Sequence, residues 1–150
     1  MIVTPDATAR YDAGRPSGRD AEPVVLIVDD YPDCREMYAM YLTLAGFRVL
    51  KARDGFEALT LAREALPDLI LMDLGLPGID GCEVTRRLKE DRATRGVPVV
   101  ALTAQTPLAA EALDTAGFET LITKPCLPDD LADRVGQLVR RHDRPSRRIA

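Results

Sequence analysis

The chain has 150 residues, a mass of 16.4 kDa and a formal net charge of −4, with 46% hydrophobic and 29% charged residues. These values are typical of one globular domain, and no run reaches the ~20 apolar residues of a membrane span. Three cysteines without CxxC spacing and a single histidine, His142, exclude a disulfide framework, a cysteine-based zinc site and a His-rich metal site. We therefore expect a protein of the reducing cytoplasm without membrane spans.

Hydrophobic periodicity divides the chain into alternating strands and helices. Short apolar runs predict five strands, and apolar residues at helical spacing follow each run and predict a helix. The runs at residues 24–28, 69–72 and 97–102 are apolar throughout, as in strands buried on both faces of a parallel sheet. In chain order we expect strand 24–28, helix 33–45, strand 48–52, helix 54–66, strand 69–72, helix 80–91, strand 97–102, helix 107–116, strand 120–123 and helix 129–141.

This alternation predicts an α/β fold with a doubly wound parallel sheet in one domain, residues 23–141. Residues 1–22 mix Pro, Gly, Asp and Arg without an apolar period, and we expect a disordered N-terminal extension. No GxGxxG follows the first strand and no GxxxxGK[ST] occurs, which excludes the dinucleotide fingerprint and the P-loop.

Charge is unevenly distributed along the chain. Residues 23–133 carry 11 basic and 19 acidic side chains, a net charge of −8, whereas residues 134–150 carry 6 basic and 1 acidic side chains, a net charge of +5. An acidic body is a poor surface for nucleic acid, so direct DNA binding is not expected. The basic C-terminal tail, residues 142–150, leaves open a weaker alternative in which its arginines bind an anion.

Four of the five predicted strands end in a residue that can take part in chemistry: Asp29 and Asp30, Asp73, Thr103 and Lys124. Ligands of open α/β sheets bind at the carboxyl ends of the strands, and with strand order 2-1-3-4-5 the three aspartates would converge there. Close carboxylates repel one another, and a hard divalent cation such as Mg²⁺ removes that penalty. A carboxylate nucleophile, a cation and a lysine together are suited to forming an acyl phosphate on an aspartate.

At these residues the sequence resembles the receiver domain of two-component response regulators. VVLIVDD at 24–30 is similar to the family's first strand and acidic pair, and LMDLGLPGIDG at 71–81 to its phosphoacceptor strand and loop. ALTA at 101–104 is similar to its switch motif, and TKP at 123–125 to its lysine motif. The resemblance covers residues 23–141 and implies a (βα)5 flavodoxin-like fold with strand order 2-1-3-4-5.

The resemblance also implies roles for the acidic residues. Asp73 would be the phosphoacceptor and would become a 4-aspartylphosphate. Asp29, Asp30 and Asp73 would hold Mg²⁺ together with the backbone carbonyl of Gly75. Asp80 is better interpreted as a helix cap than as a ligand.

Two further residues take roles from the resemblance. Lys124 would pair with the phosphoryl group, and its bond to Pro125 is cis in typical members. Thr103 would hydrogen-bond a phosphoryl oxygen and couple phosphorylation to movement. Typical members carry an aromatic residue three positions before the lysine, where this chain has Leu121, so its switch would need another route.

The resemblance implies a phosphoacceptor response regulator of a two-component or phosphorelay system. Its donor would be a phosphohistidine on a histidine kinase or histidine phosphotransfer protein. It would be no enzyme beyond catalysing its own phosphorylation and dephosphorylation. Only nine residues follow Arg141, so we expect a stand-alone receiver that acts through an unknown downstream protein.

Other interpretations remain open at this point. The chain could be a phosphate-relay intermediate, or a degenerate receiver that binds partners without phosphorylation, although the complete set of site residues argues against the latter. A phosphohydrolase of the haloacid dehalogenase type would have DxD after a strand, whereas Asp73 is followed by Leu74 and Gly75.

Overall fold

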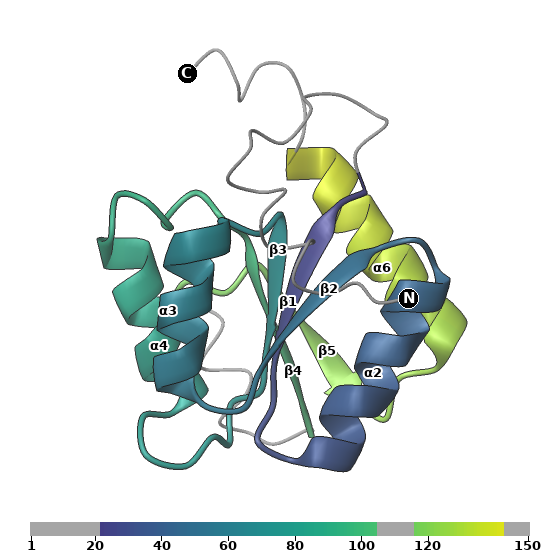
Figure 1. Ribbon diagram of the computed structural model, residues 1–150, viewed down its shortest axis with the longest axis horizontal. Coiled ribbons are helices and arrows are strands. Elements are labelled where there is room, and N and C mark those ends of the chain that lie inside the picture. The colour runs from purple at the N-terminus through teal and green to yellow at the C-terminus, as the bar shows by residue number, and fades with distance from the viewer. Residues whose placement is uncertain (1–21, 105–115, 143–150) are drawn as a thin grey trace.

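Five parallel strands form one sheet in the order β2-β1-β3-β4-β5, as the sequence predicts. The computed structural model describes residues 22–104 and 116–142 (Figure 1). Residues 1–21 of the predicted disordered extension, nearly all of the predicted helix 107–116, and the tail beyond His142 lie outside the described residues. The strands are β1 (Val24–Val28), β2 (Arg48–Ala52), β3 (Leu69–Met72), β4 (Val99–Ala104) and β5 (Thr120–Lys124).

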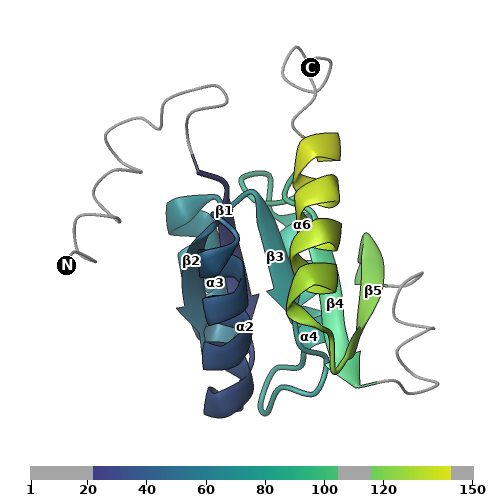
Figure 2. The same ribbon diagram turned by 90° about the vertical axis from the view of Figure 1, so that its right-hand side faces the viewer.

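Helices lie on both faces of this sheet. One face is covered by α2 (Pro32–Leu44) and α6 (Pro128–His142), and the other by α3 (Gly55–Ala65) and α4 (Gly81–Glu90), as Figures 1 and 2 show. Both α3 and α4 begin at a capping aspartate, as predicted for Asp80. Asp54 accepts a hydrogen bond from the Glu57 amide at 2.8 Å, and Asp80 accepts one from the Glu83 amide at 2.9 Å.

The hydrophobic core has two parts, one on each side of the sheet. All residues of β1 and β3 are buried, as expected for strands with helices on both faces. Leu26, Ile70 and Val99 belong to the part under α3 and α4, whereas Ile27, Leu71 and Val100 belong to the part under α2 and α6. In these strands neighbouring side chains point to opposite faces, so one apolar run supplies both parts of the core.

The fourth strand begins two residues later than predicted, at Val99. The preceding residue, Pro98, has no N–H to give to a strand ladder, although its carbonyl accepts a hydrogen bond from Ile70 at 3.0 Å. Apolar character alone therefore extended the predicted strand too far. Among the described residues, no helix is both long and apolar enough to cross a membrane.

Candidate functional site

The backbone places Asp29 and Asp73 side by side at the carboxyl edge of the sheet. The Asp29 amide donates to the Ala52 carbonyl at 3.1 Å, and the Asp73 amide donates to the Val28 carbonyl at 3.0 Å. The parallel hydrogen-bond ladder thus continues one residue beyond β1 and β3. Because β1 is paired with both β2 and β3, the register of the sheet fixes the main-chain positions of Asp29 and Asp73 relative to each other.

Three carboxylates gather at this edge. Asp29, Asp30 and Asp73 each offer one oxygen, and these oxygens lie within 4.8 Å of one another. Asp29 is 2% exposed, the Asp73 side chain is 14% exposed, and Asp30 is exposed to solvent. Such a set of hard oxygen donors, buried on one side and open to water on the other, fits a divalent cation that keeps part of its water shell.

Lys124 and Thr103 both reach the Asp73 carboxylate. The Lys124 Nζ lies 3.5 Å from Asp73 Oδ2 and 2.7 Å from Asp29 Oδ2, and the Thr103 hydroxyl donates to Asp73 Oδ1 at 3.3 Å. Burial opposes the charged form of Lys124, but the hydrogen bond to Asp29 and the charge of Asp73 together raise the pKa of Lys124 above its ordinary value. The site therefore holds a charged ammonium group against two carboxylates.

Gly75 completes the group of residues singled out from the sequence. Its amide donates to Asp73 Oδ1 at 3.1 Å, so the loop after β3 folds back onto the carboxylate. The Lys124–Pro125 peptide bond is cis, as the family resemblance implies. All six candidates, Asp29, Asp30, Asp73, Gly75, Thr103 and Lys124, thus lie at one edge of the sheet.

Two contacts at this edge were missed from the sequence. The Tyr31 amide donates to Asp29 Oδ1 at 2.9 Å, and the Arg35 Nη1 atom donates to the Asp29 carbonyl at 2.8 Å. An aspartate two residues before an amide is a known turn pattern, so the first contact had a recognisable signal. The contact of Arg35 with the Asp29 carbonyl had no specific signal in the sequence, because an arginine in the first turns of a helix can have many partners.

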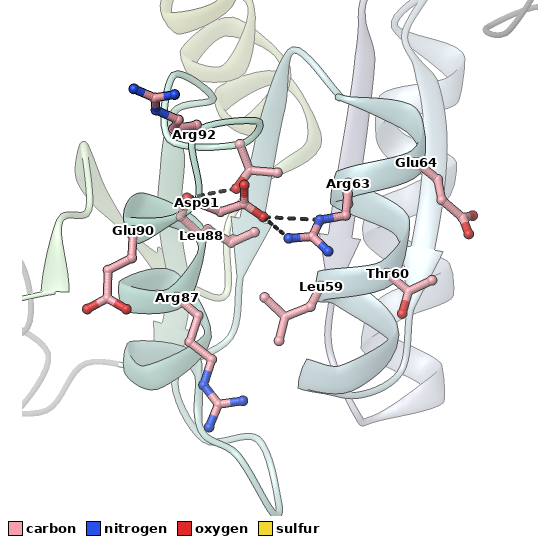
Figure 3. A pocket seen from close by; sticks show the side chains of 10 residues that line it. Leu59, Thr60, Arg63, Glu64, Arg87, Leu88, Glu90, Asp91 and Arg92 are labelled. Carbon is pink, nitrogen blue, oxygen red and sulfur yellow. Dashed lines mark hydrogen bonds and ion pairs between the residues drawn. The ribbon is translucent and has the colours of Figure 1, made fainter.

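A separate groove lies between α3 and α4, away from this edge (Figure 3). It has a volume of about 780 Å³ and is lined by the C-terminal halves of both helices, which run opposite to the strands and so end away from the acidic edge. Arg63 and Arg87 lie between the helices, and they are paired with Asp91 and Glu83. Three acidic side chains, Glu64, Glu90 and Asp91, line the groove beside three arginines, so it is not an evident anion site.

The chain matches the family model "Response regulator receiver domain" over residues 25–136. Among curated relatives, the DNA-binding response regulator MtrA of Mycolicibacterium smegmatis is 42% identical over 120 residues, which are 79% of this chain and 51% of MtrA. The phosphate regulon transcriptional regulatory protein PhoB of Pseudomonas aeruginosa is 40% identical over 119 residues, covering 78% of this chain and 52% of PhoB. The chain thus spans about half the length of these curated relatives.

Solved structures show the same similarity over nearly their whole length. The chemotaxis protein CheY4 of Vibrio cholerae has a TM-score of 0.74 and 30% identity, covering 79% of this chain and 99% of that chain. The receiver domain of the sensor histidine kinase PA1611 of Pseudomonas aeruginosa, solved with a magnesium ion in its active site cleft, also has a TM-score of 0.74, with 31% identity. It covers 79% of this chain and 98% of that chain.

The relatives contradict one prediction. Direct DNA binding was not expected, yet MtrA is a DNA-binding response regulator and RpaA of Synechocystis is a DNA-binding dual master transcriptional regulator. The prediction rested on the net charge of residues 23–133, nearly all of which lie within the part that matches the receiver domain model. The charge of that part does not decide whether a response regulator binds DNA, so the prediction is wrong. The family model matches most of the sequence, and the strand order agrees with it. The chain therefore belongs to the response regulator receiver domain family.

Proposed function

We propose that the chain is a phosphoacceptor response regulator in which Asp73 accepts a phosphoryl group from a phosphohistidine donor with the help of Mg²⁺. The observation that supports this proposal is the surroundings of the Asp73 carboxylate. Thr103 contacts one of its oxygens and Lys124 the other, and the carboxylates of Asp29 and Asp30 lie beside it.

These residues can divide the chemistry between them. A carboxylate oxygen of Asp73 attacks phosphorus, the P–N bond to the donor imidazole breaks, and the imidazole leaves with the electron pair and takes up a proton. The charged Lys124 stabilises the phosphoryl oxygens during transfer and in the product, while Thr103 donates a hydrogen bond to one of them. When bound by Asp29, Asp30, Asp73 and the Gly75 carbonyl, Mg²⁺ supplies the positive charge that offsets the crowded oxygens.

The donor in this proposal is a histidine kinase or a histidine phosphotransfer protein. The magnesium in the receiver domain of PA1611 supports the choice of cation for this chain. Cys34, Cys82 and Cys126 are free thiols, which suits the reducing cytoplasm as the place of this reaction.

In this proposal, the phosphorylated chain passes the signal on by binding a downstream partner. The curated relatives MtrA, RpaA and PhoB are regulators of transcription or DNA-binding proteins by name. DNA binding by a protein that carries this domain, measured before and after phosphorylation, is therefore the first output to assay.

Labelling with a small phosphodonor tests the proposal directly. Incubated with phosphoramidate and MgCl₂, the protein should gain one phosphoryl mass that hydroxylamine removes, as expected for an acyl phosphate. Asp73→Asn should gain none. Asp80→Asn is the matched control, because Asp80 lies in the same loop region but caps α4, and it should be labelled like the wild type. Normal labelling of Asp73→Asn would disprove the assignment.

A further inference from the structure

The turn that joins the two acidic residues to α2 is closed by three hydrogen bonds. The Tyr31 amide binds Asp29 Oδ1 at 2.9 Å, and the Arg35 amide binds the Tyr31 carbonyl at 3.0 Å. The third bond is made by a side chain, from the Arg35 Nη1 atom to the Asp29 carbonyl at 2.8 Å. The Arg35 side chain is 17% exposed, so it is held within the fold rather than extended into solvent.

The acceptor of this third bond is the oxygen of the peptide unit between Asp29 and Asp30. A peptide unit is planar, so fixing its oxygen also fixes the direction in which the chain continues to Asp30. Asp29 is further held by Lys124 and Tyr31, whereas Asp30 is exposed to solvent. The orientation of Asp30 relative to Asp29 therefore depends on this peptide unit.

The position of the Arg35 guanidinium also decides whether it raises or lowers the affinity of the carboxylates for Mg²⁺. A cation close to carboxylates reduces their attraction for Mg²⁺, whereas a group that fixes the ligands in place increases it. Because Arg35 bonds to the main-chain oxygen, it restrains the pair without occupying the carboxylate oxygens that a metal needs. The ion pair of Arg35 with Glu36, 3.9 Å long and partly exposed, contributes little by comparison.

We propose that Arg35 is a positioning residue for the metal site: its guanidinium holds the Asp29–Asp30 peptide unit so that both carboxylates face one cation. This inference rests on the proposed function, since it assigns Arg35 to the same Mg²⁺ site. Groups that orient metal ligands typically contribute 10–100-fold to metal affinity. We therefore expect at least a tenfold loss of Mg²⁺ affinity when the bond is removed.

Titration calorimetry of the unphosphorylated full chain with MgCl₂ measures this loss. Arg35→Met keeps the apolar stem and removes the donor, and it should bind Mg²⁺ at least tenfold more weakly than the wild type. Arg35→Lys keeps the charge on a shorter side chain, and it should also bind more weakly. Urea unfolding of each variant shows whether the fold is retained, and Arg35→Lys serves if Arg35→Met does not fold.

Arg53→Met is the matched control for charge. Arg53 follows Ala52, which pairs with Val28, so it leaves β2 at the level of Asp29, but its side chain is exposed. It should bind Mg²⁺ as tightly as the wild type or more tightly. Wild-type or tighter binding by Arg35→Met would overturn the inference, and so would wild-type binding by Arg35→Lys, which would assign the effect to charge alone.

A readout without metal keeps the two proposals separate. In metal-free protein, Arg35→Met or Arg35→Lys should speed hydrogen exchange of the Tyr31 amide while the Asp73 amide, bonded to Val28, stays protected. Failure of the wild type to bind Mg²⁺ would disprove the proposed function. Faster exchange of the Tyr31 amide in the variants would still show that Arg35 holds the turn. Unchanged exchange at Tyr31 would show that Arg35 does not hold the turn, and would overturn the inference.

Discussion

Replacing Lys124 by Met tests how far the stability of the fold depends on charge balance at the site. Asp29 is 2% exposed, and its Oδ2 atom lies 2.7 Å from the ammonium group of Lys124. Removing one partner of a buried ion pair leaves the other charge uncompensated and costs about 3–5 kcal/mol. Asp29 would keep its hydrogen bond from the Tyr31 amide, so we expect a loss at or below the lower end, about 2–3 kcal/mol, without metal.

Urea unfolding at neutral pH in EDTA measures this loss. With a denaturant slope of about 1–3 kcal/mol per molar urea, the midpoint should fall by about 0.7–3 M. The double variant Asp29→Asn/Lys124→Met should recover most of the loss, because Asp29, the more deeply buried of the two carboxylates beside Lys124, then carries no charge. A loss below about 0.5 kcal/mol in Lys124→Met, or a double variant no more stable than Lys124→Met, would refute the reasoning.

The pH dependence of this effect has a definite sign. The pKa of Lys124 is raised in the folded protein, so its stabilisation is fully present below the unfolded pKa, about 10.4, and is lost as pH rises through the higher folded value. The difference in unfolding free energy between wild type and Lys124→Met should therefore stay constant from about pH 7 to pH 9 and shrink only at more alkaline pH. A difference that declined within the neutral range would contradict the charged state inferred for Lys124.

Three further predictions concern Asp30, Thr103 and the glycine at the start of α4, Gly81. Asp30→Ala removes one of three carboxylates with oxygens within 4.8 Å, so calorimetry should show weaker Mg²⁺ binding. Its metal-free unfolding free energy should rise by up to about 1 kcal/mol. Thr103→Ala should still be labelled, but it loses a hydrogen bond to the phosphoryl group worth about 1.5–3 kcal/mol, a ten- to hundredfold bias between states. Amide shifts induced by beryllofluoride should then stay close to Asp73, and long-range shifts equal to those of the wild type would contradict this role. Gly81→Ala would place a Cβ atom 2.3 Å from the Asp73 carbonyl oxygen, so we expect a loss of about 1–3 kcal/mol in urea unfolding and slower labelling. Gly75→Ala, whose Cβ would lie 4.0 Å from the nearest atom, should keep wild-type stability.

The fold was predictable because its elements carry strong local patterns. The uninterrupted apolar runs of β1 and β3 leave few alternatives to strands covered on both faces, and Asp54 and Asp80 mark the starts of α3 and α4. The start of β4 was not predictable from apolar character, because Val97 is apolar but the next residue, Pro98, has no N–H to donate to the ladder. The type of each element thus followed from the hydrophobic pattern of the sequence, while the start of β4 depended on backbone hydrogen bonding.

The site was predictable as a set of residues but not as a set of contacts. Strand ends and motif spacing placed Asp29, Asp73 and Lys124 at one edge of the sheet. Spacing could not say that Lys124 lies closer to Asp29 than to Asp73, since this depends on side-chain conformation. Nor could it show that Arg35 binds the Asp29 carbonyl, because an arginine in the first turns of a helix has many possible partners.

This chain departs from the family pattern at position 121, where typical members have an aromatic residue. The contacts of Leu121 and Thr103 indicate which of the two residues could couple phosphorylation to movement. Leu121 pairs with Ala101 and packs against the core part under α3 and α4, so it has no polar group with which to respond to a charge at the site. Thr103, in contrast, already donates to Asp73 Oδ1, the carboxylate that the proposed reaction converts. Only contacts that differ between two states can bias their equilibrium. Exchange of the carboxylate for a phosphoryl oxygen as the acceptor of Thr103 is such a difference, and it acts on the end of β4. Chemistry and switching would then share one hydrogen bond, without an aromatic side chain at position 121.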